Sequence, residues 1–324
     1  MGRRPPLPRS AGITHSSPRH GAVSEAGPVL LPEQIDRWRN RRYHRQADLR
    51  LRSLPQALDF VNDVGFCLLF PARGMELPTF WEAICGEARP LPRRHHNDPE
   101  LHSLWRWKDE LPSQGLAFYG KLLRKRPTLI SLELLPHFYA LSENYGDLSD
   151  YLLEYEDGKL SEEAKRVYEA LLEHGAQPTS HLRRQAGLAG KANAARFDRA
   201  ILELQLGFKI AKTGISDANA WRYCYVYDLL PRRWPELPSR AAAIGTKEAV
   251  RTVLLTHLHN VGVARVEDVS RLFGWEPSRV DTLCDSIARD GRLWRGVRVE
   301  GQSDAYLAHA SLAQGDERVS SEPT

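Results

Sequence analysis

Hydrophobic residues recur at helical spacing along most of the chain, and this pattern predicts a mainly α-helical protein. Leu54, Leu58 and Val61 fall on one helical face, and Gly65 is the residue expected to end that helix. Prolines and polar residues at the starts of other apolar segments favour further helices. The helices predicted before residue 158 are 31–44, 54–64, 79–87, 98–112, 115–127 and 133–144.

The pattern changes after residue 160. Ser161 is the expected N-cap of a helix that ends at Gly175. Two more helices are predicted at 178–188 and 191–205, and alternating apolar residues then predict a pair of strands. The two strands are 208–214 and 221–229, with the loop 215–220 between them. Three helices followed by a two-stranded ribbon is the order of a winged helix-turn-helix unit.

Residues 246–310 repeat this order of elements. A helix ends near Gly262, two shorter helices follow, and the strands 293–301 and 304–309 close the segment. Internal duplication of this length predicts an array of winged helices, a mainly α fold with small β wings. The expected segments are a disordered basic arm (1–27), a divergent helical or winged-helix unit (28–158), a middle winged helix (159–240), a C-terminal winged helix (241–312) and a disordered tail (313–324).

Charge is distributed unevenly along the chain. Residues 1–52 contain eleven arginines and four acidic residues, and residues 181–240 contain eleven basic and five acidic residues, whereas residues 53–158 are acidic overall. Such alternation favours an oriented anionic partner such as double-stranded DNA. No apolar stretch is long enough to cross a membrane, and the four cysteines form no CxxC pair, so we expect a cytoplasmic protein with reduced thiols. No metal, cofactor or small-molecule ligand is expected.

Four segments carry a resemblance to a known family, and they are 168–184, 199–210, 222–236 and 249–275. They resemble the winged-helix DNA-binding family related to the crosslink-repair DNA glycosylases AlkZ and YcaQ. The similarity extends over roughly residues 50–310 and is strongest from residue 160 onward. It implies three winged helices stacked into a concave DNA-binding body, in which residues 50–158 form a divergent first unit.

The resemblance also implies where an active site would lie. Catalytic members of the family carry a Gln-x-Gln or Gln-x-Asp motif soon after a glycine that ends an early helix, and that motif positions the attacking water. The matching positions here follow Gly65 and are Leu68 and Phe70, neither of which can orient a water or stabilise a developing charge. Catalytic members continue into a C-terminal β-barrel, which is expected to be absent because this chain ends at Thr324.

The DNA-binding candidates lie in the middle winged helix, where basic and polar residues line the outer face of the third predicted helix and its neighbours. They are His181, Arg183, Arg184, Lys191, Asn193, Arg196, Arg199, Lys212, Trp221 and Arg222. A winged helix can instead bind protein and keep such charges solvated. The corresponding face of the last unit carries too many acidic residues to favour DNA.

Other candidate sites carry weaker expectations. Asp63 and Glu76 flank the motif position and are the carboxylates that could substitute for it, although most such residues are ordinary surface carboxylates. Residues 93–98 could bind metal or phosphate, but a solvated loop is the favoured interpretation. Trp105 fits the apolar face of its helix, which leaves Trp107 as a possible base-stacking residue. Cys67 has no histidine nearby and is expected to be buried.

Three functions stay open from the sequence. The first is a non-catalytic tandem winged-helix protein that recognises damaged or specific duplex DNA in repair or regulation. The second is an active DNA glycosylase in which Asp63 or Glu76 replaces the motif. The third is a scaffold that uses its winged helices for protein contacts.

Overall fold

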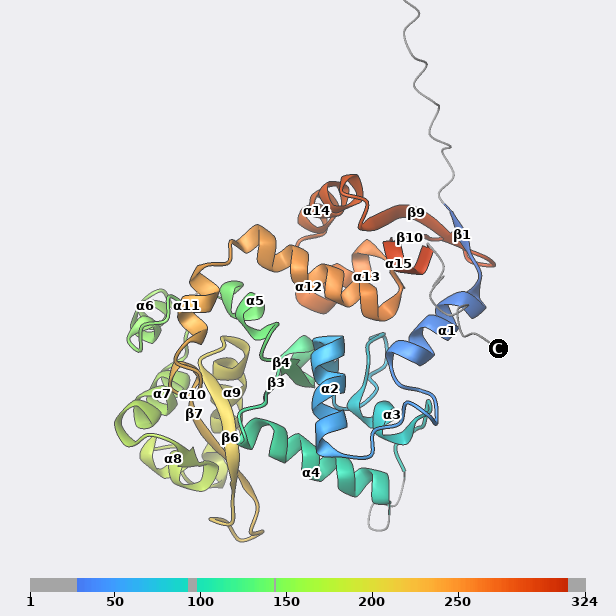
Figure 1. Ribbon diagram of the computed structural model, residues 1–324. Helices are drawn as coiled ribbons and strands as arrows, with labels where there is room; N and C mark the ends of the chain where they lie inside the picture. The colour runs from blue at the N-terminus through green and yellow to red at the C-terminus, as the bar shows by residue number, and fades with distance from the viewer. Residues whose placement is uncertain (1–27, 93–97, 143, 314–324) are drawn as a thin grey trace, which may run out of the picture.

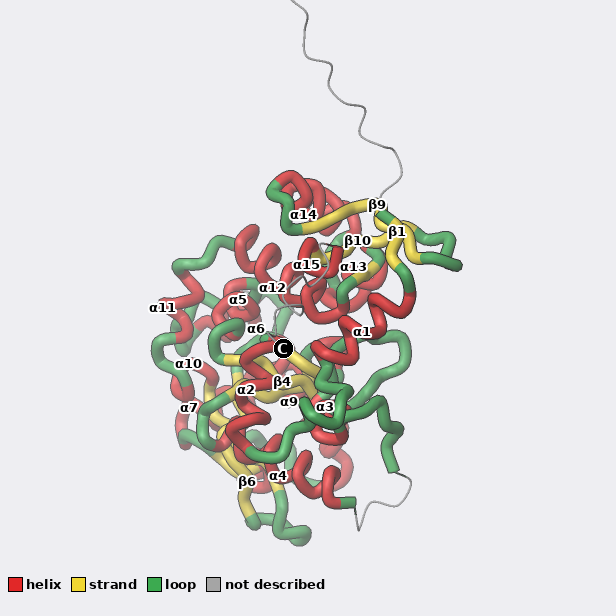
Figure 2. Tube along the Cα trace, turned by 45° about the vertical axis from the view of Figure 1, so that its right-hand side comes forward, coloured by secondary structure: helices red, strands yellow, loops and turns green. Residues whose placement is uncertain are grey.

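Three units with the same order of elements make up most of the structure, a computed structural model that describes residues 28–92, 98–142 and 144–313 (Figures 1 and 2). Each unit runs helix, short strand, helix, helix, strand, strand. The first unit comprises α2 (Leu54–Val64), β2 (Phe66–Leu68), α3 (Phe80–Cys85), α4 (Pro99–Ser113), β3 (Ala117–Lys121) and β4 (Pro127–Ser131). The predicted mainly helical fold with small sheets is confirmed.

The second and third units repeat this order. The second comprises α7 (Glu162–His174), β5 (Gln177–Pro178), α8 (Thr179–Gln185), α9 (Ala194–Leu206), β6 (Ile210–Ser216) and β7 (Cys224–Leu229). The third comprises α12 (Thr246–Val261), β8 (Val263–Ala264), α13 (Val266–Phe273), α14 (Pro277–Arg289), β9 (Leu293–Val299) and β10 (Ala305–His309). In every unit the last strand lies between the other two, so the sheets are β2-β4-β3, β5-β7-β6 and β8-β10-β9, all antiparallel.

Side-chain caps explain where several helices begin. Ser53, Thr79, Asp98 and Ser161 each accept a hydrogen bond from the backbone N–H three residues further on. The expected start at Thr79 and the expected N-cap Ser161 are therefore confirmed.

The prediction of a helix over 115–127 is wrong, because this segment forms strand β3, a tight turn and the start of β4. Phe118 and Tyr119 point to opposite sides of the sheet and are buried in two different core clusters. This period-two burial overrides the run of residues that favour a helix.

Short helices connect the units. They are α5 (Leu135–Ala140), α6 (Asp150–Glu156), α10 (Leu230–Arg233) and α11 (Leu237–Ala242), and α15 (Ala310–Ala313) follows the third unit. In Figure 1 the first unit lies at the lower right, the second at the left and the third at the top. One hydrophobic cluster includes Phe66 and Leu68 of the first unit, Phe208 beside the second, and Leu254 and Leu272 of the third. The three units therefore share a core and hold fixed positions relative to one another.

The segment before the first unit packs on the third unit. Strand β1 (Val29–Leu30) pairs in parallel with β9, and α1 (Pro32–Arg42) lies against α12 (Figure 1). Ile35 is buried beside Val263 and Val299. This segment, which the sequence groups with residues 28–158, therefore belongs in space with the last part of the chain. Among the described residues no helix is both long enough and apolar enough to span a membrane.

Candidate functional site

The stretch after Gly65 forms strand β2 at the junction of the units. Cys67 and Leu68 are fully buried, on opposite faces of the strand, and burial raises the pKa of the Cys67 thiol. Phe70 is half-buried, and its ring lies edge-on to Trp105 with 6.0 Å between centroids. No polar side chain occupies either motif position, and Leu68 contributes instead to the core that joins the units.

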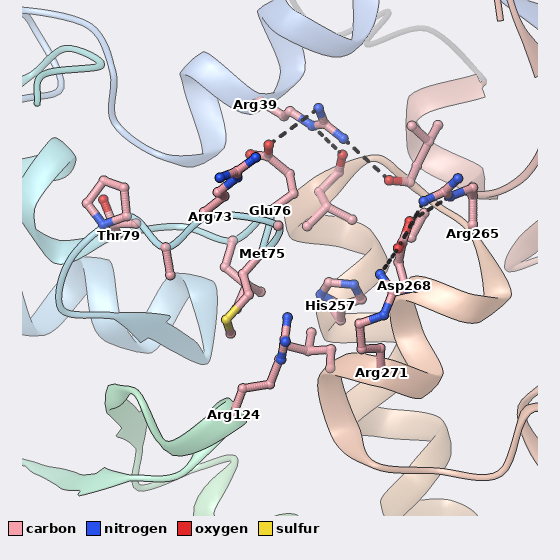
Figure 3. A pocket seen from close by; sticks show the side chains of 18 of the residues that line it. Arg39, Arg73, Met75, Glu76, Thr79, Arg124, His257, Arg265, Asp268 and Arg271 are labelled. Carbon is pink, nitrogen blue, oxygen red and sulfur yellow. Dashed lines mark hydrogen bonds and ion pairs between the residues drawn. The ribbon is translucent and has the colours of Figure 1, made fainter.

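A cavity of 620 Å³ opens next to this strand (Figure 3). Its walls come from α1, the loop that follows β2, the turn between β3 and β4, α12 and α13, and so from both ends of the chain. Six arginines line it, together with three acidic residues. The charged lining residues are Arg39, Arg45, Arg73, Arg124, Arg265, Arg271, Glu76, Glu82 and Asp268.

Several of these charges are paired. Arg265 and Arg271 both bind Asp268, at 2.8 and 3.0 Å, and Arg45 binds Glu82 at 2.9 Å. By contrast, Arg73 and Arg124 have no ion-pair partner in the part of the chain that the structure describes, and Figure 3 draws no interaction from either. The cavity therefore presents unneutralised guanidinium groups, which suit an anionic ligand.

A neutral histidine lies in the wall of the cavity. His257 is 3% exposed, and burial, assisted by the charge of Arg39, lowers its pKa to about 3. Its Nδ1 atom has no hydrogen-bond partner within the described residues. Figure 3 shows the imidazole between Arg124 and Arg271 on one side and Glu76 and Arg39 on the other.

The cavity continues into two shallower depressions of 400 and 480 Å³. It shares Arg124 and Arg271 with the first, which in turn shares Lys125 and Leu206 with the second. We call the three together the central groove. It passes from α1 and the third unit, across the β3–β4 turn of the first unit, to α9 of the second unit.

Basic residues outnumber acidic ones two to one along the central groove. The ten basic residues are Arg39, Arg45, Arg73, Arg124, Lys125, Lys159, Arg199, Lys209, Arg265 and Arg271. The five acidic residues are Glu76, Glu82, Glu154, Glu203 and Asp268. The sequence analysis identified only Arg199 and Glu76 of these as site residues, because the others come from segments that only the fold brings together. The run of three bases at 124–126 was the available signal, and its assignment to a helix concealed it.

Most other predicted DNA-binding residues are on the surface of the second unit, outside the central groove. His181, Arg184, Arg196 and Arg222 are exposed, and Trp221 is 88% exposed on the β6–β7 loop. Two basic residues of this surface are ion-paired: Arg183 with Asp198 at 2.8 Å and Arg196 with Glu163 at 2.5 Å. Lys191 and Asn193 lie on a 3-10 turn, η2 (Lys191–Asn193), ahead of α9 instead of on its face.

The prediction for Lys212 is corrected, because this residue is buried and cannot contact DNA. Its side chain has no exposed surface, and its ammonium group binds Asp109, which also accepts a 2.6 Å hydrogen bond from Lys108. Tyr225 packs its ring 4.2 Å from the Lys212 ammonium. Burial and the adjacent charge of Lys108 lower the pKa of Lys212 to about 8. The Lys108–Asp109–Lys212 cluster joins α4 of the first unit to β6 of the second.

The two tryptophans of α4 have the reverse of their predicted placement. Trp107 is 2% exposed in the core, whereas Trp105 is 45% exposed. Leu101, Leu104 and Trp107 lie on the buried face of the helix, and Trp105 lies outside it. Residues 93–97 of the predicted metal or phosphate loop lie outside the described residues, and Asp98 caps α4 and binds Arg89. No metal-binding cluster of three or more His, Cys, Asp or Glu exists among the described side chains.

The two candidate carboxylates have different surroundings. Asp63 lies outside the cavity lining and accepts a 2.8 Å hydrogen bond from Arg42, which also donates to Asn260 of α12. Glu76 lines the cavity, is about half exposed, and lies 3.8 Å from Arg39. Burial, followed by the nearby charge of Glu76, raises the pKa of Tyr43. Of these two carboxylates, only Glu76 lines the cavity and could act on a ligand there.

Comparison with known proteins places the chain in a family. A solved structure of a DNA glycosylase AlkZ from Streptomyces sahachiroi matches with a TM-score of 0.51 and 17% identity, over 87% of this chain and 70% of that one. At this identity the likeness shows a common fold. No curated protein matches the chain in sequence. The model of the AlkZ-related family matches residues 51–274, which is more than half of the sequence, and the chain belongs to that family.

Proposed function

We propose that this protein binds double-stranded DNA along the central groove through three winged-helix units, without cleaving it. The observation that carries the proposal is that one groove touches all three units and has twice as many basic as acidic residues. Three of the basic residues, Arg73, Arg124 and Lys125, have no ion-pair partner among the described residues. A row of unpaired cations suits a phosphate backbone, whose counterions are released on binding.

The repeated order of elements supports winged-helix units. In each unit a short strand follows the first helix, two more helices come next, and two final strands complete the sheet, with the last strand between the other two. The family name and the glycosylase AlkZ that shares the fold support DNA as the partner. Leu68 and Phe70 at the motif positions support a role without glycosidic-bond cleavage, since neither can activate water.

The first test is duplex binding at several salt concentrations. We expect the logarithm of the affinity to fall linearly with the logarithm of salt, and the Arg73→Ala, Arg199→Ala variant to bind more weakly with a shallower slope. The matched control, Arg184→Ala, Arg222→Ala, removes two exposed charges outside the groove. If only the control pair weakens binding, DNA lies on the outer face of the second unit. A parent protein that binds no duplex would favour the protein scaffold.

The second candidate function is a DNA glycosylase that uses Glu76. The favouring observation is that this carboxylate lines the cavity beside unpaired arginines, whereas Asp63 does not line it. The test is incubation with alkylated or crosslinked duplex, followed by heat or alkali to reveal abasic sites. We expect no strand breaks above background. Breaks that persist in Asp63→Asn but vanish in Glu76→Gln would establish the glycosylase and refute the non-catalytic proposal.

A further inference from the structure

The turn between β3 and β4, which we call the basic turn (Leu122–Arg126), has an unusual backbone. Arg124 has φ of 46° and Lys125 has φ of 62°, so two consecutive residues with side chains adopt the left-handed conformation. Tight hairpin turns of this kind normally contain glycine or asparagine, because a Cβ atom is disfavoured there. Strain of this kind persists where the surrounding structure imposes it, and it concentrates at functional sites.

The basic turn is held in place by buried residues on one side. Leu122 and Leu123 are 8% and 6% exposed, and both belong to the core shared by the three units, together with Leu272 and Phe208. The backbone N–H groups of Lys125 and Arg126 donate to the carbonyls of Leu122 and Leu123, at 3.0 and 2.9 Å. The turn therefore cannot swing away from the central groove without exposing two leucines.

The two strained residues extend into different parts of the central groove. Arg124 lines the cavity and the adjoining depression, whereas Lys125 lines that depression and the one beside α9. Both side chains are exposed, and neither has an ion-pair partner in the described parts of the chain. The left-handed backbone thus lets two neighbouring cations line opposite ends of the middle depression.

We propose that the basic turn is the central phosphate grip of the protein: Arg124 and Lys125 bind successive backbone phosphates of one DNA strand on the two sides of the turn. This inference rests on the proposed DNA binding and adds a point of contact to it. A grip on the sugar–phosphate backbone positions the nucleic acid and carries no sequence preference. The strained turn lowers the stability of the fold, and it places two positive charges where the three units meet.

The test compares binding and stability in one set of variants. Arg124→Gly, Lys125→Gly removes both charges and also the strain, and Arg124→Ala, Lys125→Ala removes the charges but keeps the strain. We expect both pairs to lower duplex affinity by roughly 10- to 100-fold at 0.1 M salt and to reduce the log–log salt slope by about 1.8, the value for two lost phosphate contacts. The glycine pair should have a higher melting temperature than the alanine pair and the parent.

The matched control is Lys121→Ala, Arg126→Ala, which removes the same charge from the same hairpin at two exposed residues that do not line the central groove. We expect it to keep the parent salt slope. If the parent binds duplex and the glycine pair binds it with an unchanged salt slope, the proposal of a phosphate grip is wrong, whereas the proposal of DNA binding in the groove stands. If the control pair lowers the salt slope as much as the glycine pair, DNA contacts the whole hairpin and not Arg124 and Lys125 in particular. The proposal of a phosphate grip is then also wrong. A parent that binds no duplex overturns both proposals.

Discussion

At the scale of single residues, Lys212 and Lys108 share one carboxylate, Asp109, in a site closed by aromatic rings. Burial opposes ionisation of Asp109, but the hydrogen bonds from both lysines outweigh it and lower the pKa of this carboxyl. Burial, followed by the positive charge of Lys108, lowers the pKa of Lys212 to about 8, because one carboxylate does not offset two ammonium groups.

The lowered pKa of Lys212 makes stability depend on pH in alkaline solution. Folded Lys212 releases its proton near pH 8, while in the unfolded chain it keeps the proton up to about 10.5, so between these values the unfolded state binds more protons. The free energy of unfolding should therefore rise from pH 8 to pH 10, by up to about 1.4 kcal/mol per unit. Urea unfolding at pH 7.5, 8.5 and 9.5 measures this. Lys212→Met should remove the rise, and the exposed control Lys121→Met should keep it.

Removal of the shared carboxylate should cost far more than removal of a surface one. Asp109→Asn leaves two buried ammonium groups without a counter-charge and should lower the free energy of unfolding by about 3–5 kcal/mol. Asp63→Asn breaks an ion pair with Arg42 in which the carboxylate is half exposed, and should cost about 1 kcal/mol or less. Chemical denaturation of both variants provides the comparison. Equal losses of unfolding free energy in the two variants would mean that Asp109 is not needed to neutralise Lys108 and Lys212.

At the scale of elements, glycines at helix ends set how closely the units approach. Gly65 ends α2 with φ of +73°, and a Cβ atom added there would lie 2.9 Å from Thr256 of α12 and 3.0 Å from Leu134. Gly274 ends α13 with nearly the same φ of +72°, but a Cβ there would meet nothing within 4 Å. Gly65 is therefore needed both for the left-handed backbone at the end of α2 and for the close contact between the first and third units.

This pair of glycines allows backbone strain to be separated from packing. Gly274→Ala should cost about 1 kcal/mol, from the left-handed conformation alone. Gly65→Ala carries the same strain and adds a clash in the core, which should raise the loss by about a further 1–3 kcal/mol. Thermal or urea unfolding of the two variants measures the difference. Equal losses would show that α12 shifts to accommodate the methyl group.

Helices were predictable from the sequence because their caps and periodic apolar faces are local properties, as at Ser161 and Thr79. The β3–β4 hairpin was not, because its turn contains Arg124 and Lys125 in place of glycine or asparagine, the residues that normally mark such turns. The reversed order of Trp105 and Trp107 has a similar origin. Which of two tryptophans at the edges of an apolar helix face is buried depends on tertiary packing, which the pattern of a single helix does not contain.

At the scale of the whole molecule, the central groove depends on residues that are far apart in sequence. Its cavity joins Arg39 near one end of the described chain to Arg265 and Arg271 near the other. Composition indicated an anionic partner, but the place where charges converge follows from the shared core and from the packing of α1 on α12. Lys212 also shows that sequence alone does not locate a charge, since this lysine of a predicted wing strand is buried between two units.

One buried and two half-buried histidines should make the stability of the protein sensitive to mild acid. Burial lowers the pKa of His257 to about 3 and those of His259 and His309, whose rings lie 4.8 Å apart, to about 4. The unfolded chain takes up these protons near pH 6.5, so its free energy falls relative to the folded state as the pH drops below that value. We expect the free energy of unfolding to decrease between pH 6.5 and pH 5, by up to about 1.4 kcal/mol per unit for each histidine.

Urea unfolding at pH 7.0, 6.0 and 5.0 checks this expectation, because carboxylates hardly titrate in that range. His309→Gln should show a smaller decrease than the parent protein, whereas replacement of the exposed His181 by Gln should leave the decrease unchanged. A parent protein whose stability is constant over this range would contradict the lowered pKa values of these histidines.

The pairing of β1 with β9 also bears on how the chain folds during synthesis. Val29 pairs with Arg298, so a ribosome must add 269 more residues before this partner residue exists. At 5–20 residues per second this takes roughly 13–54 s. Throughout that time Ile35 and Trp38 lack the surface that later covers them, and the nascent chain presents an uncovered amphipathic helix to chaperones. The surface that covers α1 thus comes from the third unit, which is synthesised long after α1 itself.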